Sequence, residues 1–75
     1  MLYHMWYNMT PIHAVAMRIK ALREKRGWTQ QQLADEAGIS RTYLARIETA
    51  RHDPTLTILE KIARALKVKV GRLVD

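Results

Sequence analysis

A chain of 75 residues allows one domain with a single hydrophobic core and excludes a second. The absence of cysteine excludes disulfide bonds and thiolate zinc sites and fits a reducing cytoplasm, while three Gly and two Pro favour helices over a turn-rich β fold. Thirteen Lys and Arg against seven Asp and Glu give a net charge of +6, so a polyanion is the expected partner.

The N-terminal part of the sequence differs in composition from the rest. Residues 1–17 contain no Asp, Glu, Lys or Arg, so all the formal charge lies from Arg18 onward. The apolar stretch MLYHMWYNM falls short of the roughly 20 apolar residues that a membrane span needs, and it lacks the basic start and cleavage site of a secretory signal. We expect residues 1–13 to form an extension, disordered or packed on the domain or a partner subunit, and residues 14–75 to form the domain, with no membrane partner.

Two helices are predicted at the start of the domain. Apolar residues at helical spacing predict the first helix over 14–26, and Gly27 ends it. The second helix follows Thr29, which can form a capping box with Gln32, and it ends at Gly38. The apolar residues expected to face inward from these two helices are Val15, Ile19, Leu22, Leu33, Ala34 and Ala37.

Three more helices complete the predicted fold. Ser40 can cap a third helix that runs to about Thr49. After a loop, a fourth helix begins at Asp53 or Thr55 and ends near Lys67, and a short fifth helix is predicted at the C-terminus. The inward-facing residues of the third and fourth helices are Leu44, Ile47, Leu59, Ile62, Ala63 and Leu66. We therefore expect a compact all-α domain of five helices.

The segment 30–49 meets several independent requirements of a helix-turn-helix. Ala34 is small where the second and third helices must approach closely, and Gly38 stands where the turn requires a positive φ. The apolar interior of the motif would come from Leu33, Ala37, Ile39, Leu44 and Ile47. An ordinary helical corner would match one or two of these requirements, so the complete set predicts a helix-turn-helix.

The stretch RIKALREKRGWTQQQLADEAGISRTYLARIE, followed by PTLTILEKIARALKV, resembles the phage-repressor-like (Cro/C1-type) helix-turn-helix family over about residues 18–74. RTYLARIE, a basic loop and PTLTILEKIARAL are also similar to the controller proteins of restriction-modification systems, a branch of that family. The resemblance implies a five-helix lambda-repressor-like DNA-binding domain, cytoplasmic residence, operator binding as a two-fold dimer, and transcriptional control. One departure is Ala50, where the family often has Gly.

The solvent side of the third helix carries the candidate base-reading residues. With the apolar residues inward, the 100° step of the helix points Thr42, Ala45 and Arg46 outward, and Arg41 lies on the flank near the helix start. The two arginines could each donate two hydrogen bonds to guanine, and Thr42 or Ala45 could touch a thymine methyl. The resemblance implies base contacts at Arg41, Thr42 and Arg46. The alternative is a solvated basic face.

Phosphate contacts are expected around the same helix. Thr29 and Gln30 stand at the N-terminus of the second helix, where backbone N–H groups and the helix dipole favour an anion. The resemblance implies that Gln30 binds phosphate. Tyr43, Thr49 and Arg51 are further candidates, although an ordinary surface role explains them equally well.

Two other groups of residues are expected to be structural. The resemblance implies an ion pair between Arg23 and Glu48 that ties the first helix to the third. We expect Trp28 to be a core residue. The residues predicted to form an apolar two-fold interface, together with the aromatic tail, are Ile58, Val70, Leu73 and Val74. Such a dimer would place its recognition helices about 34 Å apart, one DNA turn. The alternative is that these residues only close the core of the monomer.

Enzyme and metal functions find little support in the sequence. His4, His13 and His52 lack metal-ligand spacing, and no Ser, His and Asp arrangement typical of catalysis is recognisable. We expect no enzyme activity, cofactor, metal or small-molecule ligand. The leading hypothesis is a homodimeric transcriptional regulator that binds an inverted repeat in double-stranded DNA. The alternatives are a restriction-modification controller or antitoxin-type autoregulator, and a protein-interaction module on the same fold.

Overall fold

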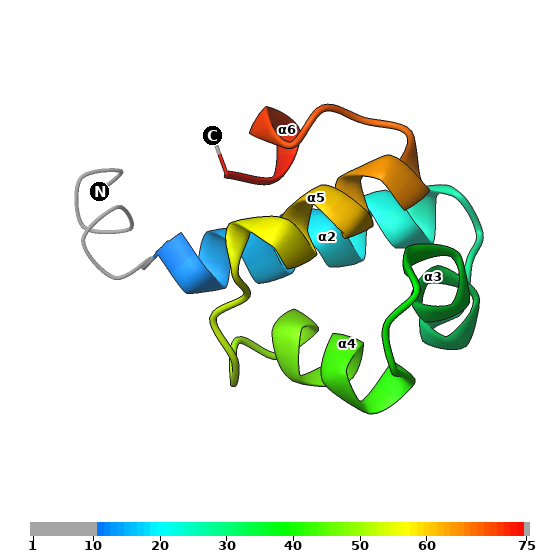
Figure 1. Ribbon diagram of the computed structural model, residues 1–75, viewed down its shortest axis with the longest axis horizontal. Coiled ribbons are helices and arrows are strands. Elements are labelled where there is room, and N and C mark those ends of the chain that lie inside the picture. The colour runs from blue at the N-terminus through cyan, green and yellow to red at the C-terminus, as the bar shows by residue number, and fades with distance from the viewer. Residues whose placement is uncertain (1–10, 75) are drawn as a thin grey trace.

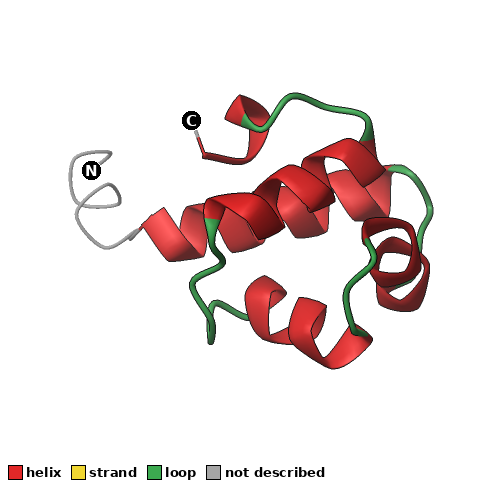
Figure 2. Cartoon of the chain, in the orientation of Figure 1, coloured by secondary structure: helices red, strands yellow, loops and turns green. Residues whose placement is uncertain are grey.

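The computed structural model of the protein describes residues 11–74, which form five α-helices and no strand (Figures 1 and 2). The helices are α2 (Pro11–Lys25), α3 (Gln30–Ala37), α4 (Arg41–Glu48), α5 (Leu56–Leu66) and α6 (Gly71–Val74). The predicted all-α fold is therefore confirmed. None of the helices in the described range has the length and apolar character needed to cross a bilayer.

The first described helix, α2, begins at Pro11, three residues before the predicted start at Ala14. Proline suits the first turn of a helix because its φ is already close to the helical value and the N–H it lacks would have no partner there. Residues 11–13 of the predicted extension therefore belong to α2. Residues 1–10 lie outside the described range, and their disorder or packing stays a prediction.

The core is built from the apolar faces of all five helices. The large side chains that are less than 2% exposed are Ile19, Leu33, Leu44, Ile47, Ile62, Leu66 and Leu73. Burying each of these contributes about 1.5–3 kcal/mol relative to exposure. In this arrangement α3 packs against both α4 and α5, while α2 packs against α4, α5 and α6. All of these core residues except Leu73 were predicted to face inward.

The ends of the helix-turn-helix are capped as the sequence predicted. Thr29 Oγ1 accepts a hydrogen bond from the backbone N–H of Gln32, and the Gln32 side chain accepts one from the backbone N–H of Thr29. Ser40 Oγ accepts from the backbone N–H of Tyr43 at the start of α4. Gly38 adopts a φ of 72°, which lets the chain turn sharply from α3 into α4. These local interactions fix where the two helices begin and how they are joined.

The residue that follows α4 and its C-cap, Ala50, adopts a left-handed φ of 58°, so it keeps the backbone geometry that glycine usually supplies. This region costs a residue with a Cβ about 1–2 kcal/mol. We expect Ala50→Gly to raise the free energy of unfolding by about 0.5–1 kcal/mol, because relief of strain exceeds the larger backbone entropy that glycine loses on folding. Urea unfolding followed by circular dichroism measures the change.

The reciprocal control is Gly38→Ala. A Cβ at Gly38 would meet no atom within 4 Å, so the substitution acts only through the positive φ. It should lower the free energy of unfolding by about 1 kcal/mol. Equal stability of the Ala50 and Gly38 variants would contradict the assignment of strain to Ala50.

Candidate nucleic-acid interface

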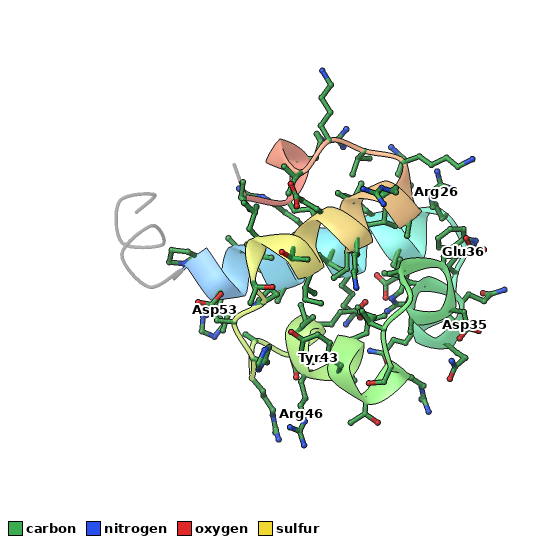
Figure 3. The ribbon with its side chains drawn as sticks, in the orientation of Figure 1. Arg26, Asp35, Glu36, Tyr43, Arg46 and Asp53 are labelled. Carbon is green, nitrogen blue, oxygen red and sulfur yellow. The ribbon has the colours of Figure 1, made fainter. Side chains whose placement is uncertain are left out.

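Helix α4 has one buried face and one face open to solvent. Leu44 and Ile47 are 0% and 1% exposed, whereas Arg41, Thr42 and Arg46 are exposed. Figure 3 shows Arg46 pointing away from the body of the protein. The predicted orientation of this helix is therefore confirmed, and the side chains on its open face are available to a partner.

The open face of α4 is electropositive because it carries two arginines and no exposed carboxylate of this helix. Within the described residues, neither Arg41 nor Arg46 forms an ion pair. Ala45 lies half-buried on the same helix. Glu48 is the one carboxylate of α4, and its side chain is 1% exposed and held by Arg23. The charge that α4 presents to solvent is therefore that of its two arginines.

The N-terminus of α3 supplies a second polar feature of this surface. The backbone N–H of Gln32 is taken by the cap residue Thr29, which leaves the N–H groups of Gln30 and Gln31 without an acceptor inside the helix. The positive end of the helix dipole lies at the same place. The Gln30 side chain is half-buried and donates from Nε2 to Glu48 Oε1 at 3.1 Å. This arrangement can bind an anion through backbone and side-chain donors together.

The loop after α4 is attached to the helix by an aromatic contact. Tyr43 Oη and His52 Nε2 are hydrogen-bonded at 3.1 Å, and the two rings meet edge to face with centroids 4.8 Å apart. Sequence reasoning considered His52 only as a metal ligand and missed this contact. No sequence signal links the two residues, because the contact depends on how the loop turns after α4.

The remaining phosphate candidates differ in how free their donors are. Arg51 is exposed in the loop. Thr49 caps the end of α4, and its hydroxyl donates to the carbonyl of Ala45 at 2.8 Å. Because a hydroxyl has one proton, Thr49 could donate to a phosphate only by giving up this bond. The geometry therefore favours Arg51 over Thr49.

A buried ion pair lies directly behind this surface. Arg23 Nε donates to Glu48 Oε2 at 2.8 Å and Arg23 Nη2 donates to Glu48 Oε1 at 3.0 Å, so the structure contains the ion pair that the resemblance implies, in bidentate form. Arg23 Nη1 also donates to the carbonyl of Trp28 at 2.7 Å. The hydrogen bonds that Arg23 donates to Glu48 raise the pKa of Arg23 and outweigh the opposing effect of burial. The pair joins α2 to α4 and contributes no free charge.

The residues predicted to form a dimer interface are not all exposed. Leu73 is 0% exposed because α6 folds back onto α2, so this assignment is corrected: Leu73 closes the core of the monomer. Ile58 and Val70 are half-buried against the core, and Val74 is 46% exposed. The predicted dimer interface is therefore reduced to Val74 and the outer parts of Ile58 and Val70. Sequence reasoning missed two other exposed apolar side chains, Met17 and Leu56.

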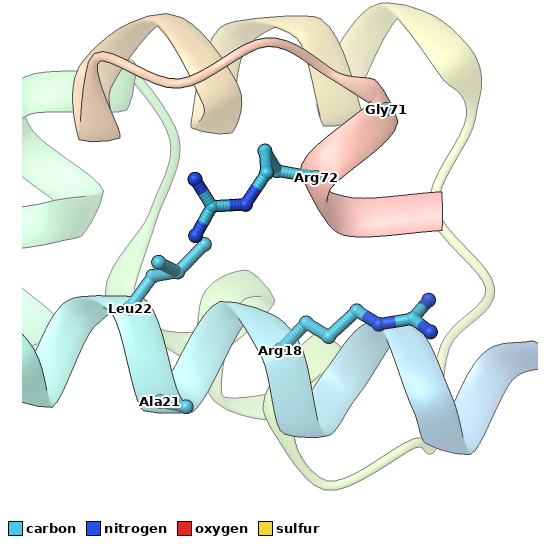
Figure 4. Close-up of a pocket in the computed structure, with 5 residues that line it drawn as sticks. All are labelled: Arg18, Ala21, Leu22, Gly71 and Arg72. Atoms are coloured by element: carbon cyan, nitrogen blue, oxygen red, sulfur yellow. The ribbon is translucent and has the colours of Figure 1, made fainter. Parts of the chain in front are cut away.

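The described residues also form features that lie outside this interface. A hollow of about 400 Å³ lies between α2 and α6 and is lined by Arg18, Leu22 and Arg72, none of which is a candidate DNA-contacting residue (Figure 4). Trp28 is half-buried and packs on the core beneath the guanidinium of Arg26. Residues 11–74 contain no group of three or more His, Cys, Asp or Glu side chains that could hold a metal ion.

Comparison with known proteins identifies relatives of nearly the whole described region. The profile of a family described as helix-turn-helix matches residues 19–73. The immunity repressor protein of Bacillus phage phi105 is 50% identical over 60 residues, which cover 80% of this chain and 42% of the repressor. The chain spans about half the length of the curated relatives it matches.

Solved structures match the fold closely. The N-terminal DNA-binding domain of SinR from Bacillus subtilis superposes with a TM-score of 0.80 at 36% identity, covering 84% of this chain and 93% of that domain. The restriction-modification controller protein C.AhdI from Aeromonas hydrophila gives a TM-score of 0.81 at 27% identity, covering 83% of this chain and 94% of C.AhdI.

Proposed function

Because this chain belongs to the phage-repressor-like (Cro/C1-type) helix-turn-helix family, we propose that it is a transcriptional regulator that binds double-stranded DNA sequence-specifically. The observation that carries the proposal is the open face of α4, where Arg41, Thr42 and Arg46 are exposed opposite a buried apolar face. A helix of this kind fits the major groove of B-DNA. In the proposal, α4 is the recognition helix.

The residues on the open face of α4 have roles in reading bases. Arg41 and Arg46 donate pairs of hydrogen bonds to guanine O6 and N7, because a guanidinium presents donors with the matching spacing. The methyl groups of Thr42 and Ala45 contact thymine methyls. Their contacts with bases determine how the affinity depends on the operator sequence.

Residues around α4 hold the DNA backbone in register. Gln30 and Thr29 bind a phosphate at the N-terminus of α3, where the helix dipole and unpaired N–H groups support an anion. Arg51 adds a contact from the loop after α4, and Tyr43 and Thr49 are weaker candidates because both hydroxyls already have partners. Such contacts strengthen binding to all sequences alike.

The regulator acts as a cytoplasmic homodimer on an inverted repeat, without catalysis, cofactor or metal. A single eight-residue helix covers few base pairs, so two copies would supply the larger interface that tight binding requires. Val74, with the outer parts of Ile58 and Val70, forms the two-fold contact in this proposal. The two α4 helices then lie about 34 Å apart on one side of the DNA.

The test is binding to labelled duplex DNA, followed by fluorescence anisotropy at increasing salt. The logarithm of the affinity is expected to fall linearly with the logarithm of salt concentration, by about 0.9 per phosphate contacted. Selection from random duplexes is then expected to recover an inverted repeat. A selected site upstream of the chain's own gene would favour a controller-type autoregulator. Absent or salt-insensitive binding would contradict the proposal and favour a protein-interaction module.

A further inference from the structure

We propose that Glu48 is a positioning residue for phosphate binding: its buried carboxylate holds the side-chain amide of Gln30 in the one orientation that directs a free N–H toward the DNA backbone. The inference rests on the proposed function and goes beyond the ion pair between Arg23 and Glu48. It gives this buried carboxylate a role in recognition through Gln30, which itself touches the phosphate.

Arg23 holds the carboxylate of Glu48 in place independently of Gln30. Two hydrogen bonds from Arg23, at 2.8 and 3.0 Å, fix both of its oxygens, and the side chain of Glu48 is 1% exposed. Gln30 Nε2 then donates to Oε1 of this fixed group at 3.1 Å. The amide of Gln30 is therefore attached to α4 and, through Arg23, to α2.

The chemistry of the pair decides which way the amide faces. A carboxylate is only an acceptor, so the NH₂ group of Gln30 must face Glu48 and the carbonyl oxygen must not. One N–H of that group is used by Glu48, and in the proposal the second is directed to the phosphate that also meets the backbone N–H groups of Gln30 and Gln31, which have no acceptor inside α3. A phosphate oxygen needs donors, and the arrangement supplies them on one side of the helix end. Because the side chain is already ordered, it loses less conformational entropy when it binds.

The neighbouring residue Gln31 provides a matched comparison. Gln31 Nε2 donates to Asp35 Oδ1 at 2.8 Å, which is the same chemical pair within α3. Both of these residues are exposed, and no arginine holds Asp35 in the described structure. Gln31 and Asp35 therefore serve as controls with the same amide and a carboxylate that is not preorganised.

The first test is a double-mutant cycle on DNA affinity, measured by anisotropy well below the melting temperature of each variant. Gln30→Ala is expected to weaken binding about tenfold, the effect of losing one hydrogen bond to a charged group. Glu48→Gln is expected to weaken binding by a similar factor, and the double variant is expected to be no weaker than Gln30→Ala alone. If the fold-loss in DNA affinity of the double variant equals the product of the two single fold-losses, the inference is overturned.

A phosphate-specific readout separates positioning from a general loss of structure. Duplexes carrying a single neutral methylphosphonate identify the phosphate whose replacement weakens binding of the wild type but not of Gln30→Ala. Glu48→Gln is expected to be insensitive at that same phosphate. If Glu48 only stabilised the fold, this variant would bind more weakly but keep its sensitivity there. Asp35→Asn, which changes only the exposed carboxylate that Gln31 contacts, is expected to bind within about twofold of the wild type and to keep the sensitivity.

NMR of the unmodified protein decides the question even if Glu48→Gln does not fold. The side-chain amide proton of Gln30 that is bonded to Glu48 is expected to exchange with water more slowly than the amide proton of Gln31 that is bonded to Asp35, because the acceptor of Gln30 is buried. Equal exchange rates for the two amides would overturn the inference. Absence of salt-dependent DNA binding by the wild type would instead contradict the proposed function, so the two failures are distinguishable.

Discussion

Replacing Glu48 by alanine is expected to lower the free energy of unfolding by about 3–5 kcal/mol. The substitution leaves the guanidinium of Arg23 buried, with the carbonyl of Trp28 as its remaining close acceptor. A charge that has lost both water and its counterion destabilises the folded state strongly. A small domain has a total stability of about 5–15 kcal/mol, so this loss is a large fraction of the total.

Two controls distinguish burial from simple ion pairing in urea unfolding experiments. Glu24 also lies 3.9 Å from Arg23, but its side chain is 58% exposed, so Glu24→Ala should cost less than about 1 kcal/mol. Replacing both partners, with Arg23→Met and Glu48→Leu, removes the unpaired charge and should recover most of the stability. A loss below about 1 kcal/mol for Glu48→Ala would show that water reaches the pair and would contradict its burial.

The Arg46→Ala variant is expected to lose about 1–3 kcal/mol of binding free energy on its selected operator, the value of one bidentate contact to guanine. On operators in which the base pair that Arg46 contacts is changed, the wild type also lacks this contact. The wild type and Arg46→Ala should therefore bind these operators with equal affinity. Gln30→Ala should instead weaken binding to all of these operators by a similar factor. Anisotropy titrations on a panel of single-base operator variants measure both patterns.

Arg72→Ala is the matched control for this experiment. Arg72 is an exposed arginine of α6 that lines the hollow against α2 (Figure 4), so its removal changes the net charge by the same amount without altering α4. It should reduce affinity slightly and equally for all operators. Uniform losses for Arg46→Ala across the panel would remove its role as a base reader and leave it as a phosphate contact.

Much of the fold was predictable because its signals are local. The apolar spacing along α4 placed Leu44 and Ile47 inward, and the structure buries both. The capping box at Thr29 and the turn at Gly38 also depend only on residues within a few positions of each other. At Ala50 the same local rules were less informative, because the structure keeps a left-handed backbone there without glycine.

By itself, the sequence determined that the chain is helical, where its helix-turn-helix lies and which side of α4 is open, since backbone periodicity and caps act over single turns. Only the tertiary structure decided which residues each inward-facing apolar side chain and each polar side chain contacts. It buried Leu73 in the monomer, because an apolar residue is covered by whichever surface packs on it, here α2. It also joined Gln30 to Glu48 across 18 positions and Tyr43 to His52, since such contacts depend on crossing angles and loop paths that no short-range pattern encodes.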